Sequence, residues 1–334
     1  MTVPPDPTVA PARPRGRRRL ALAVQATGVV LCLAAVVWVV RGVDVHLLSE
    51  TLGRVTLPPL ILAVTLNVTG QLTRAAGWRV LLGLAHRLPG ARLVQYEFAA
   101  QAVTAITPEG SGEALRLWWL SREGVPPATT TAIIAARKLM SSLGLVPFVV
   151  VLPWTADLPV WCVWLVAAYS GLLVALLAVL LVFLHRRQPY TEPAGGRVRR
   201  LARKVLDGLT PLREGRVLAA SFGLACTTRA TDLAAAWIVT ASLGLPTGYA
   251  AAVLPLLLIE VSNALPTAPA QIGSFEAGAA SAVRLLGGSA TDSVAFAVLF
   301  HAQQVLPQIV AGLVPLWAVS TARRREATRQ EQTK

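Results

Sequence analysis

Two stretches of the chain, TPEGSGE at residues 107–113 and PAQIGSFE at residues 269–276, interrupt long apolar sequence. Proline removes a backbone hydrogen-bond donor and glycine destabilises a helix, so each stretch predicts a break in helical structure at membrane depth. Broken backbone is tolerated there only where protein buries it or where it lines a wet cavity. Two such breaks in corresponding halves of a chain are typical of a transport site. The backbone positions expected to form the breaks are Pro108, Gly110, Gly112, Pro269 and Gly273.

The composition is that of a membrane protein. Of the 334 residues, 54% are hydrophobic and only 14% are charged, whereas soluble domains carry about 25% charged residues. The formal net charge of +14 could indicate nucleic-acid binding. That class is excluded because no segment between the apolar runs is long enough for a soluble basic domain.

The apolar runs predict an all-α polytopic membrane protein. Six stretches are long enough to cross a bilayer: 20–40, 57–73, 129–151, 159–184, 217–243 and 293–318. Two further apolar regions, 93–125 and 249–290, contain the breaks, and we expect each to form a re-entrant helical hairpin, giving eight or more membrane segments. The alternative is that each broken region makes two ordinary crossings.

The same reading divides the chain into five parts. They are a disordered basic tail (1–19), a first transmembrane half (20–184) with a broken motif at 107–116, a basic cytoplasmic linker (185–216), a second half (217–320) with a broken motif at 266–277, and a C-terminal tail (321–334).

The basic residues predict the orientation. Most of the 31 Lys and Arg fall on one side under simple alternation of the spans, and only Arg41, Arg54 and Arg284 fall in the opposite loops. Such asymmetry favours both termini in the cytoplasm of a bacterial-type inner membrane. The two broken motifs then approach the midplane from opposite faces, which predicts two inverted, pseudo-symmetric halves. The basic linker is expected to anchor this orientation and to contact anionic lipid head groups.

Several charged residues within apolar sequence are candidate substrate-binding residues. Glu113 and Arg116 share one helix face at i, i+3, and together they suit a zwitterionic head group or form a structural ion pair. Arg137 lies deep in an apolar run, where a guanidinium either binds a phosphate diester or extends to the membrane edge. Lys138 is expected to extend to that edge.

The second half offers similar candidates. Glu260 has no cationic residue within a helical turn, so it requires a distant partner, a proton or a cationic substrate group. Glu276 follows the second break, in the position that corresponds to Glu113. Arg229 and Asp232 are spaced i, i+3 and form a possible ion pair. His301 is expected to be a hydrogen-bonded packing residue.

The motif PEGSGEALR at residues 108–116, followed by Gly124 and Arg137, resembles the transmembrane region of lysylphosphatidylglycerol synthases, also called the flippase-like or UPF0104 family. In the second half, Leu265-Pro266, Pro269, Gly273 and the run FEA at 275–277 agree with the family pattern. The similarity covers residues 20–320. It implies a membrane domain that moves an aminoacylated phospholipid between leaflets. For this chain we expect a phospholipid or another lipid-linked substrate that passes through a polar cavity at the midplane.

The chain also departs from the family pattern. Only a short polar tail follows residue 320, so we expect no soluble synthase domain. Ala270-Gln271 stands where relatives often have two glycines, and Ala136 and Met140 stand where they commonly have carboxylates. These differences put a lysyl-lipid in doubt as the specific cargo.

Motifs for other chemistry are missing. The sequence has no phosphate-binding loop and no Cys/His constellation, so we expect no cofactor, no metal site and no catalytic residues. The expected protein is transporter-like and not an enzyme. Two alternatives remain: a non-catalytic membrane partner of a soluble synthase, and an intramembrane lipid transferase whose paired carboxylates serve as acid and base.

Overall fold

A computed structural model of the chain describes Val37 and residues 43–83, 86–107, 110–186, 197–263 and 271–332. Side chains are described from residue 202 onward in the segment 197–263, and up to Val314 in the segment 271–332. The tail 1–19, almost all of the expected span 20–40, Pro108, Glu109 and residues 264–270 with Pro269 lie outside the described residues.

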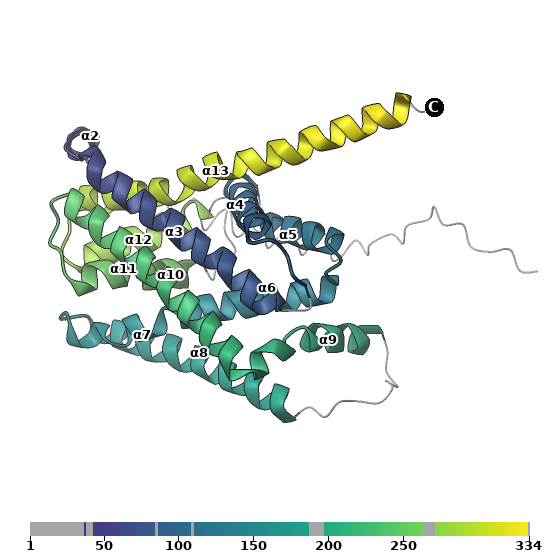
Figure 1. Cartoon of the computed structure of the whole chain (residues 1–334). Helices are drawn as coiled ribbons and strands as arrows, with labels where there is room; N and C mark the ends of the chain where they lie inside the picture. Colours follow the sequence, from purple (N-terminus) through teal and green to yellow (C-terminus); the bar gives the residue numbers. More distant parts are fainter. Residues whose placement is uncertain are drawn as a thin grey trace, which may run out of the picture.

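The described residues form helices and no strands (Figure 1). The first half contains α2 (Val45–Gly53), α3 (Leu57–Leu82), α4 (Gly90–Ile106), α5 (Ser111–Arg122), α6 (Pro127–Leu143), α7 (Val146–Val149), η1 (Leu152–Trp154) and α8 (Val160–Arg186). The linker contains α9 (Arg197–Asp207) and η2 (Thr210–Arg213), and the second half contains α10 (Gly215–Ser242), α11 (Tyr249–Ser262), α12 (Ser274–Leu285) and α13 (Ala290–Gln332).

Three segments within the described ranges are long and apolar enough to cross a membrane, and a fourth is added if the bent pair α2–α3 counts as one span. The three are Pro127–Trp154, Val160–Arg186 and Ala290–Val314, which match three of the six expected spans. The expected span 217–243 coincides with α10, whose 28 residues have sufficient length. It is not among the candidates because Arg229 and Asp232 lower its hydropathy.

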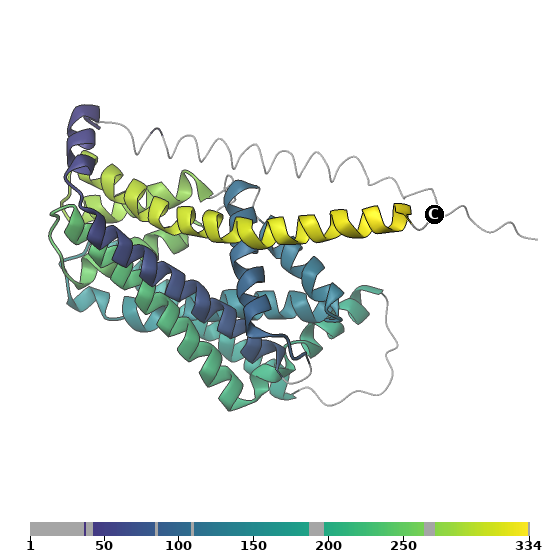
Figure 2. The ribbon, with the colours of Figure 1, turned by 45° about the horizontal axis from the view of Figure 1, so that its top comes forward.

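The interior helices pack closely through small residues. Helices α3 and α10 run side by side in both ribbon views (Figures 1 and 2). At Gly70 of α3 a Cβ atom would lie 2.9 Å from Thr231 Oγ1 of α10, and at Gly312 of α13 it would lie 2.4 Å from the Phe98 carbonyl oxygen of α4. Glycine at these points lets the backbones approach as they do in other membrane helix bundles.

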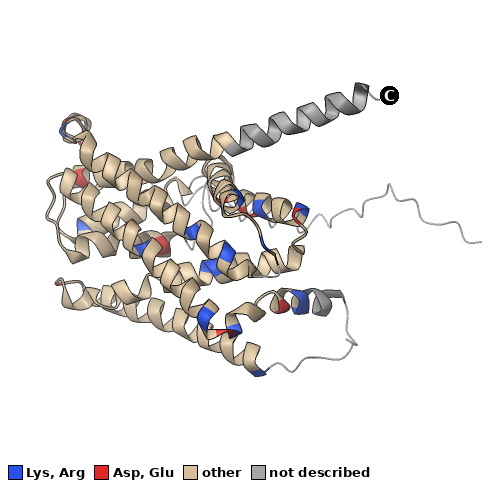
Figure 3. Cartoon of the chain, viewed as in Figure 1, with Lys and Arg blue, Asp and Glu red and all other residues tan. Residues whose placement is uncertain are grey.

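Helix α8 differs from these interior helices. Of its 27 residues only Cys162, Val166 and Leu184 are buried. Figure 3 shows charged residues on α3, α6 and α10, whereas α8 carries no Lys, Arg, Asp or Glu before Arg186. An exposed apolar helix of this length indicates a face that contacts lipid.

The helices that follow the two breaks begin in a similar way. Gly110, at φ +90°, precedes the 12-residue helix α5, and Gly273, at φ +93°, precedes the 12-residue helix α12. Both helices begin with serine and carry glutamate at their third position. Only glycine adopts such a φ without strain. The predicted interruption of the helix is therefore present in both halves, and α4–α5 and α11–α12 form the two hairpins.

Each hairpin contains a second glycine at the contact between its helices. A Cβ atom at Gly112 would lie 2.2 Å from Thr104 Oγ1 and 2.4 Å from the Ala100 carbonyl oxygen. A Cβ atom at Gly278 would lie 2.8 Å from the backbone of Ile259. Because backbone atoms cannot move aside as a flexible side chain can, both positions require glycine for the helices to meet.

Candidate functional site

A buried carboxylate lies at the centre of the first half. Glu97 of α4 has a side chain that is 2% exposed. Its oxygens lie 3.2 Å from Arg116 Nη2 of α5 and 3.2 Å from Arg137 Nη1 of α6. Trp78 of α3 donates a 2.9 Å hydrogen bond from Nε1 to the same carboxylate, and the Arg137 guanidinium lies over the Trp78 ring at 4.6 Å. Four helices thus meet at one ion-pair cluster.

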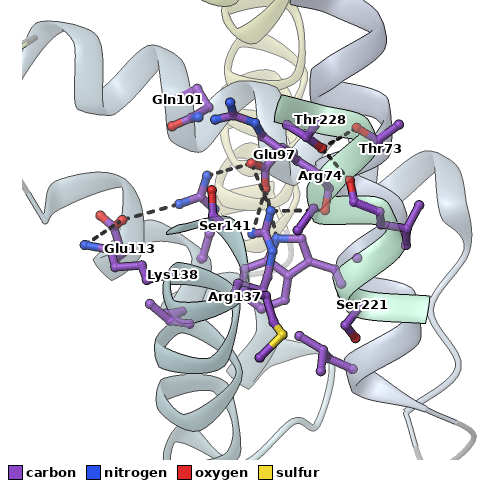
Figure 4. A pocket seen from close by; sticks show the side chains of 18 residues that line it. Thr73, Arg74, Glu97, Gln101, Glu113, Arg137, Lys138, Ser141, Ser221 and Thr228 are labelled. Carbon is purple, nitrogen blue, oxygen red and sulfur yellow. Dashed lines mark hydrogen bonds and ion pairs between the residues drawn. The ribbon is translucent and has the colours of Figure 1, made fainter. Parts of the chain in front are cut away.

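This cluster borders a cavity of about 170 Å³, the first cavity, which lies between α3, α4, α5, α6 and α10 (Figure 4). Glu113 lies at its rim, where its Oε1 atom is 3.7 Å from both Lys138 Nζ and Arg116 Nη1. Of the sequence-predicted residues, the structure therefore brings together Glu113, Arg116 and Arg137. The Glu113–Arg116 contact is longer than the contact that Arg116 makes with Glu97.

Several donors at the first cavity have no acceptor. The buried Arg74 Nε, Arg116 Nε and Ser221 Oγ atoms have no hydrogen-bond partner among the described residues, and all three residues line the cavity. Leaving a buried donor unpaired costs about 1–3 kcal/mol. The buried Glu113 Oε2 atom at this cavity also has no partner among the described residues, so the wall of the cavity contains both unpaired donors and an unpaired acceptor.

A larger cavity of about 620 Å³, the second cavity, lies toward the second half. Arg229 Nη2 donates a 2.7 Å bond to Glu260, and Ser142 Oγ donates a 2.6 Å bond to the same carboxylate. Glu260 thus has the distant partner that its isolation in the sequence requires. Arg229 lies 3.6 Å from Asp232, the pair expected from the sequence, but Asp232 lies closer, at 3.0 Å, to Arg74 of α3.

The two cavities share part of their walls. Arg74, Lys138 and Ser141 line both of them. Leu172 and Leu173 of the lipid-facing helix α8 line the second cavity only. The two cavities therefore adjoin at these three residues, and we call the two together the polar path. The first contains the Glu97 cluster, and the second contains the Arg229–Glu260 pair and borders apolar side chains of an outer helix.

The second break is stabilised by its own hydrogen bonds. Glu276 Oε2 accepts a 2.6 Å bond from the Gly273 N–H, and Glu276 Oε1 lies 2.6 Å from His301 Nδ1. The His301 ring stacks on Phe275 with 4.2 Å between centroids. Glu276 therefore occupies the same helix position as Glu113 but has different partners, and it lines neither of the two cavities described here.

Gln271, at the end of the second break, combines a left-handed backbone conformation with a side-chain hydrogen bond. Its φ of +58° is the single positive value of a non-glycine residue in the part of the chain that the structure describes. Its Oε1 atom accepts a 3.0 Å bond from Asn263 Nδ2, and Asn263 Oδ1 accepts one of 3.0 Å from Ser274 Oγ. The bond from Asn263 thus holds the side chain of a residue whose backbone conformation is strained for glutamine and would be unstrained for glycine.

Sequence reasoning missed Glu97, Trp78 and Arg74. The importance of Glu97 could have been predicted, because it lies in an apolar stretch with no Lys or Arg within one helical turn. An unpaired charge in such a stretch requires a partner from another helix. Nothing in the sequence indicates that both Arg116 and Arg137 supply it.

The comparison with known families agrees with this architecture. The family model described as lysylphosphatidylglycerol synthase TM region matches residues 25–312. The chain belongs to this family. The match to the lysylphosphatidylglycerol synthase transmembrane family includes both breaks, both cavities and the linker, and it indicates a membrane protein of lipid metabolism. No curated protein matches the sequence.

Proposed function

We propose that this protein moves a phospholipid, or another lipid with a phosphate-containing head group, between the two leaflets of a bacterial-type inner membrane. The observation that carries the proposal is the pair of adjoining polar cavities inside an apolar helical protein. Charged side chains are costly within a membrane, and they are typical of substrate pathways there. Family membership supports a lipid as the cargo.

The geometry suits a lipid better than a water-soluble solute. The second cavity is within the range of about 300–1,000 Å³ that small-molecule sites occupy, and its 620 Å³ are bordered by α8 leucines. A head group would lie among the arginines while its acyl chains stay against the apolar side chains of α8. The proposal gives Arg116 and Arg137 the phosphate, and Glu113 and Glu260 the remaining polar part of the head group.

The matching local structure of the hairpins supports alternating access. In the proposed arrangement α4–α5 and α11–α12 are re-entrant elements of two inverted halves, which rock about the shared wall of Arg74, Lys138 and Ser141. The basic linker and both termini lie in the cytoplasm in this scheme, in keeping with the distribution of positive charge. Helix α9, with its basic sequence RVRRLARKVLD, would contact anionic lipid.

Lipid translocation in proteoliposomes tests the proposal. Acyl-labelled phospholipid in the outer leaflet is extracted with albumin at intervals, so that loss of extractable label reports inward movement. Wild-type protein should accelerate this loss at least about tenfold over protein-free vesicles. Glu113→Gln should reduce the rate strongly, because Glu113 lies at the cavity rim between two cations. Glu276→Gln should also reduce it, because it weakens the second break.

A control variant makes the assay specific. Glu50→Gln changes an exposed carboxylate that forms an ion pair with Arg54 one turn away, and it should leave the rate unchanged. Folded wild-type protein that moves no lipid across a panel of head groups would contradict the proposal. It would then favour the alternative in which the linker recruits a soluble lipid-modifying enzyme.

A further inference from the structure

The polar path carries more positive than negative charge. Among the described residues that line the two cavities, the cations are Arg74, Arg116, Arg137, Lys138 and Arg229, and the carboxylates are Glu97, Glu113, Asp232 and Glu260. The cations therefore exceed the carboxylates by one. Inside a membrane an uncompensated charge is expensive, so the path favours an occupant of opposite sign.

The ion pairs place this excess among Arg116, Arg137 and Lys138, which share two carboxylates. Asp232 lies with Arg74 at 3.0 Å and Glu260 with Arg229 at 2.7 Å. Glu97 lies between Arg116 and Arg137, each at 3.2 Å. The remaining carboxylate, Glu113, lies 3.7 Å from Lys138 and is equally distant from Arg116.

Lys138 is also the most accessible of the cations in these ion pairs. Its side chain is 65% exposed, whereas that of Arg74 is 27% exposed and those of the other three are less so. It lines both cavities, and its Nζ atom lies 3.7 Å from Glu113 at the rim of the first one. Helix α6 places it one position after Arg137, which binds the buried Glu97.

We propose that Lys138, where the two cavities meet, selects a cargo whose head group carries one net negative charge, as a phosphodiester without an amine does. This inference rests on the proposed function and names its substrate class. The phosphate oxygens would accept from Lys138, and the positive charges of Arg74 and Arg116, which line the first cavity with it, would add to the attraction. A cationic aminoacyl lipid would instead add positive charge to a path that already has an excess.

A comparison of the translocation rates of lipids with different charge tests the inference. Phosphatidylglycerol, phosphatidylcholine and a lysyl ester of phosphatidylglycerol, each labelled on an acyl chain so that the head group is intact, are compared in the albumin assay. Wild-type protein should move the anionic lipid about fivefold faster than the zwitterionic one, the effect of roughly one accessible ion pair. The cationic lipid should be slowest.

Variants at Lys138 provide the decisive comparison. Lys138→Gln should reduce the ratio of the anionic to the zwitterionic translocation rate to about one, and Lys138→Glu should bring that ratio below one, whatever the absolute rates are. Lys204→Gln removes the same charge from an exposed position on α9 and should keep the wild-type preference. A preference that Lys138→Gln leaves unchanged overturns the inference.

Other outcomes separate the inference from the proposed function. Equal rates for all three lipids, or faster movement of the cationic one, overturn the anionic cargo and leave lipid translocation standing. Uptake of radiolabelled glycerophosphoglycerol with no movement of any lipid overturns both, because the acceptor is then a soluble phosphodiester.

Discussion

Replacing Glu97 by alanine is expected to lower the free energy of unfolding by about 3–5 kcal/mol, the usual cost of removing one partner from a buried ion pair. The carboxylate is 2% exposed and lies 3.2 Å from each of two guanidinium groups. Its removal takes the nearest carboxylate from both Arg116 and Arg137, and among the described carboxylates Arg116 keeps only the 3.7 Å contact with Glu113. It also removes the acceptor of the Trp78 indole N–H. Thermal unfolding in detergent, followed by tryptophan fluorescence, measures the loss.

Two further variants make this prediction specific. Glu50→Ala breaks an ion pair whose side chains are 73% and 47% exposed, and it should cost less than about 1 kcal/mol. Adding Arg137→Met to Glu97→Ala removes one of the two cations that lost the Glu97 carboxylate and should restore part of the lost stability. A Glu97→Ala protein as stable as the wild type would contradict the central place of this cluster in the fold.

Replacing Gly112 by alanine is expected to separate the helices of the first hairpin. The added methyl group would lie 2.4 Å from a backbone oxygen of α4, and overpacking of this kind costs about 1–3 kcal/mol or more. Gly278→Ala should have the same effect in the second hairpin, because its new Cβ meets the Ile259 backbone at 2.8 Å. Both variants should unfold at lower temperature and move lipid more slowly.

Gly171→Ala in α8 is the matched control. No atom lies within 4 Å of the new Cβ, so the substitution should be neutral or stabilise the helix by up to about 1 kcal/mol. If Gly112→Ala and Gly278→Ala unfolded at the same temperature as Gly171→Ala, the close helix contacts described here would be wrong.

The sequence predicts those features that depend on local chemistry. Proline and glycine in apolar surroundings predict the two breaks, and the structure has a helix start with the same glycine, serine and glutamate pattern at each. The apolar runs predict the helices that became α6, α8 and α13, and the quoted motifs predict the family. Glu276 and Glu113 correspond in position, as expected from their spacing after each break.

The sequence does not predict the pairing of charges between helices. Arg229 and Asp232 are one turn apart, which favours a pair, yet each has a shorter contact with a residue of another helix, Glu260 and Arg74 respectively. Glu97 has no local partner and receives two arginines from α5 and α6. Such contacts depend on how helices pack, and neither periodicity nor spacing encodes that arrangement for a single chain.

The central claim is that a lipid head group enters the two cavities, and photolabelling tests it most directly. A phosphatidylglycerol analogue with a diazirine on its head group is irradiated with the protein in vesicles, and the labelled residues are identified by mass spectrometry. We predict labels on residues of the cavity walls, such as Ser141 and Thr228, which excess unlabelled phosphatidylglycerol suppresses. Labels confined to α9 and to the exposed face of α8, with none on the cavity walls, would contradict the account.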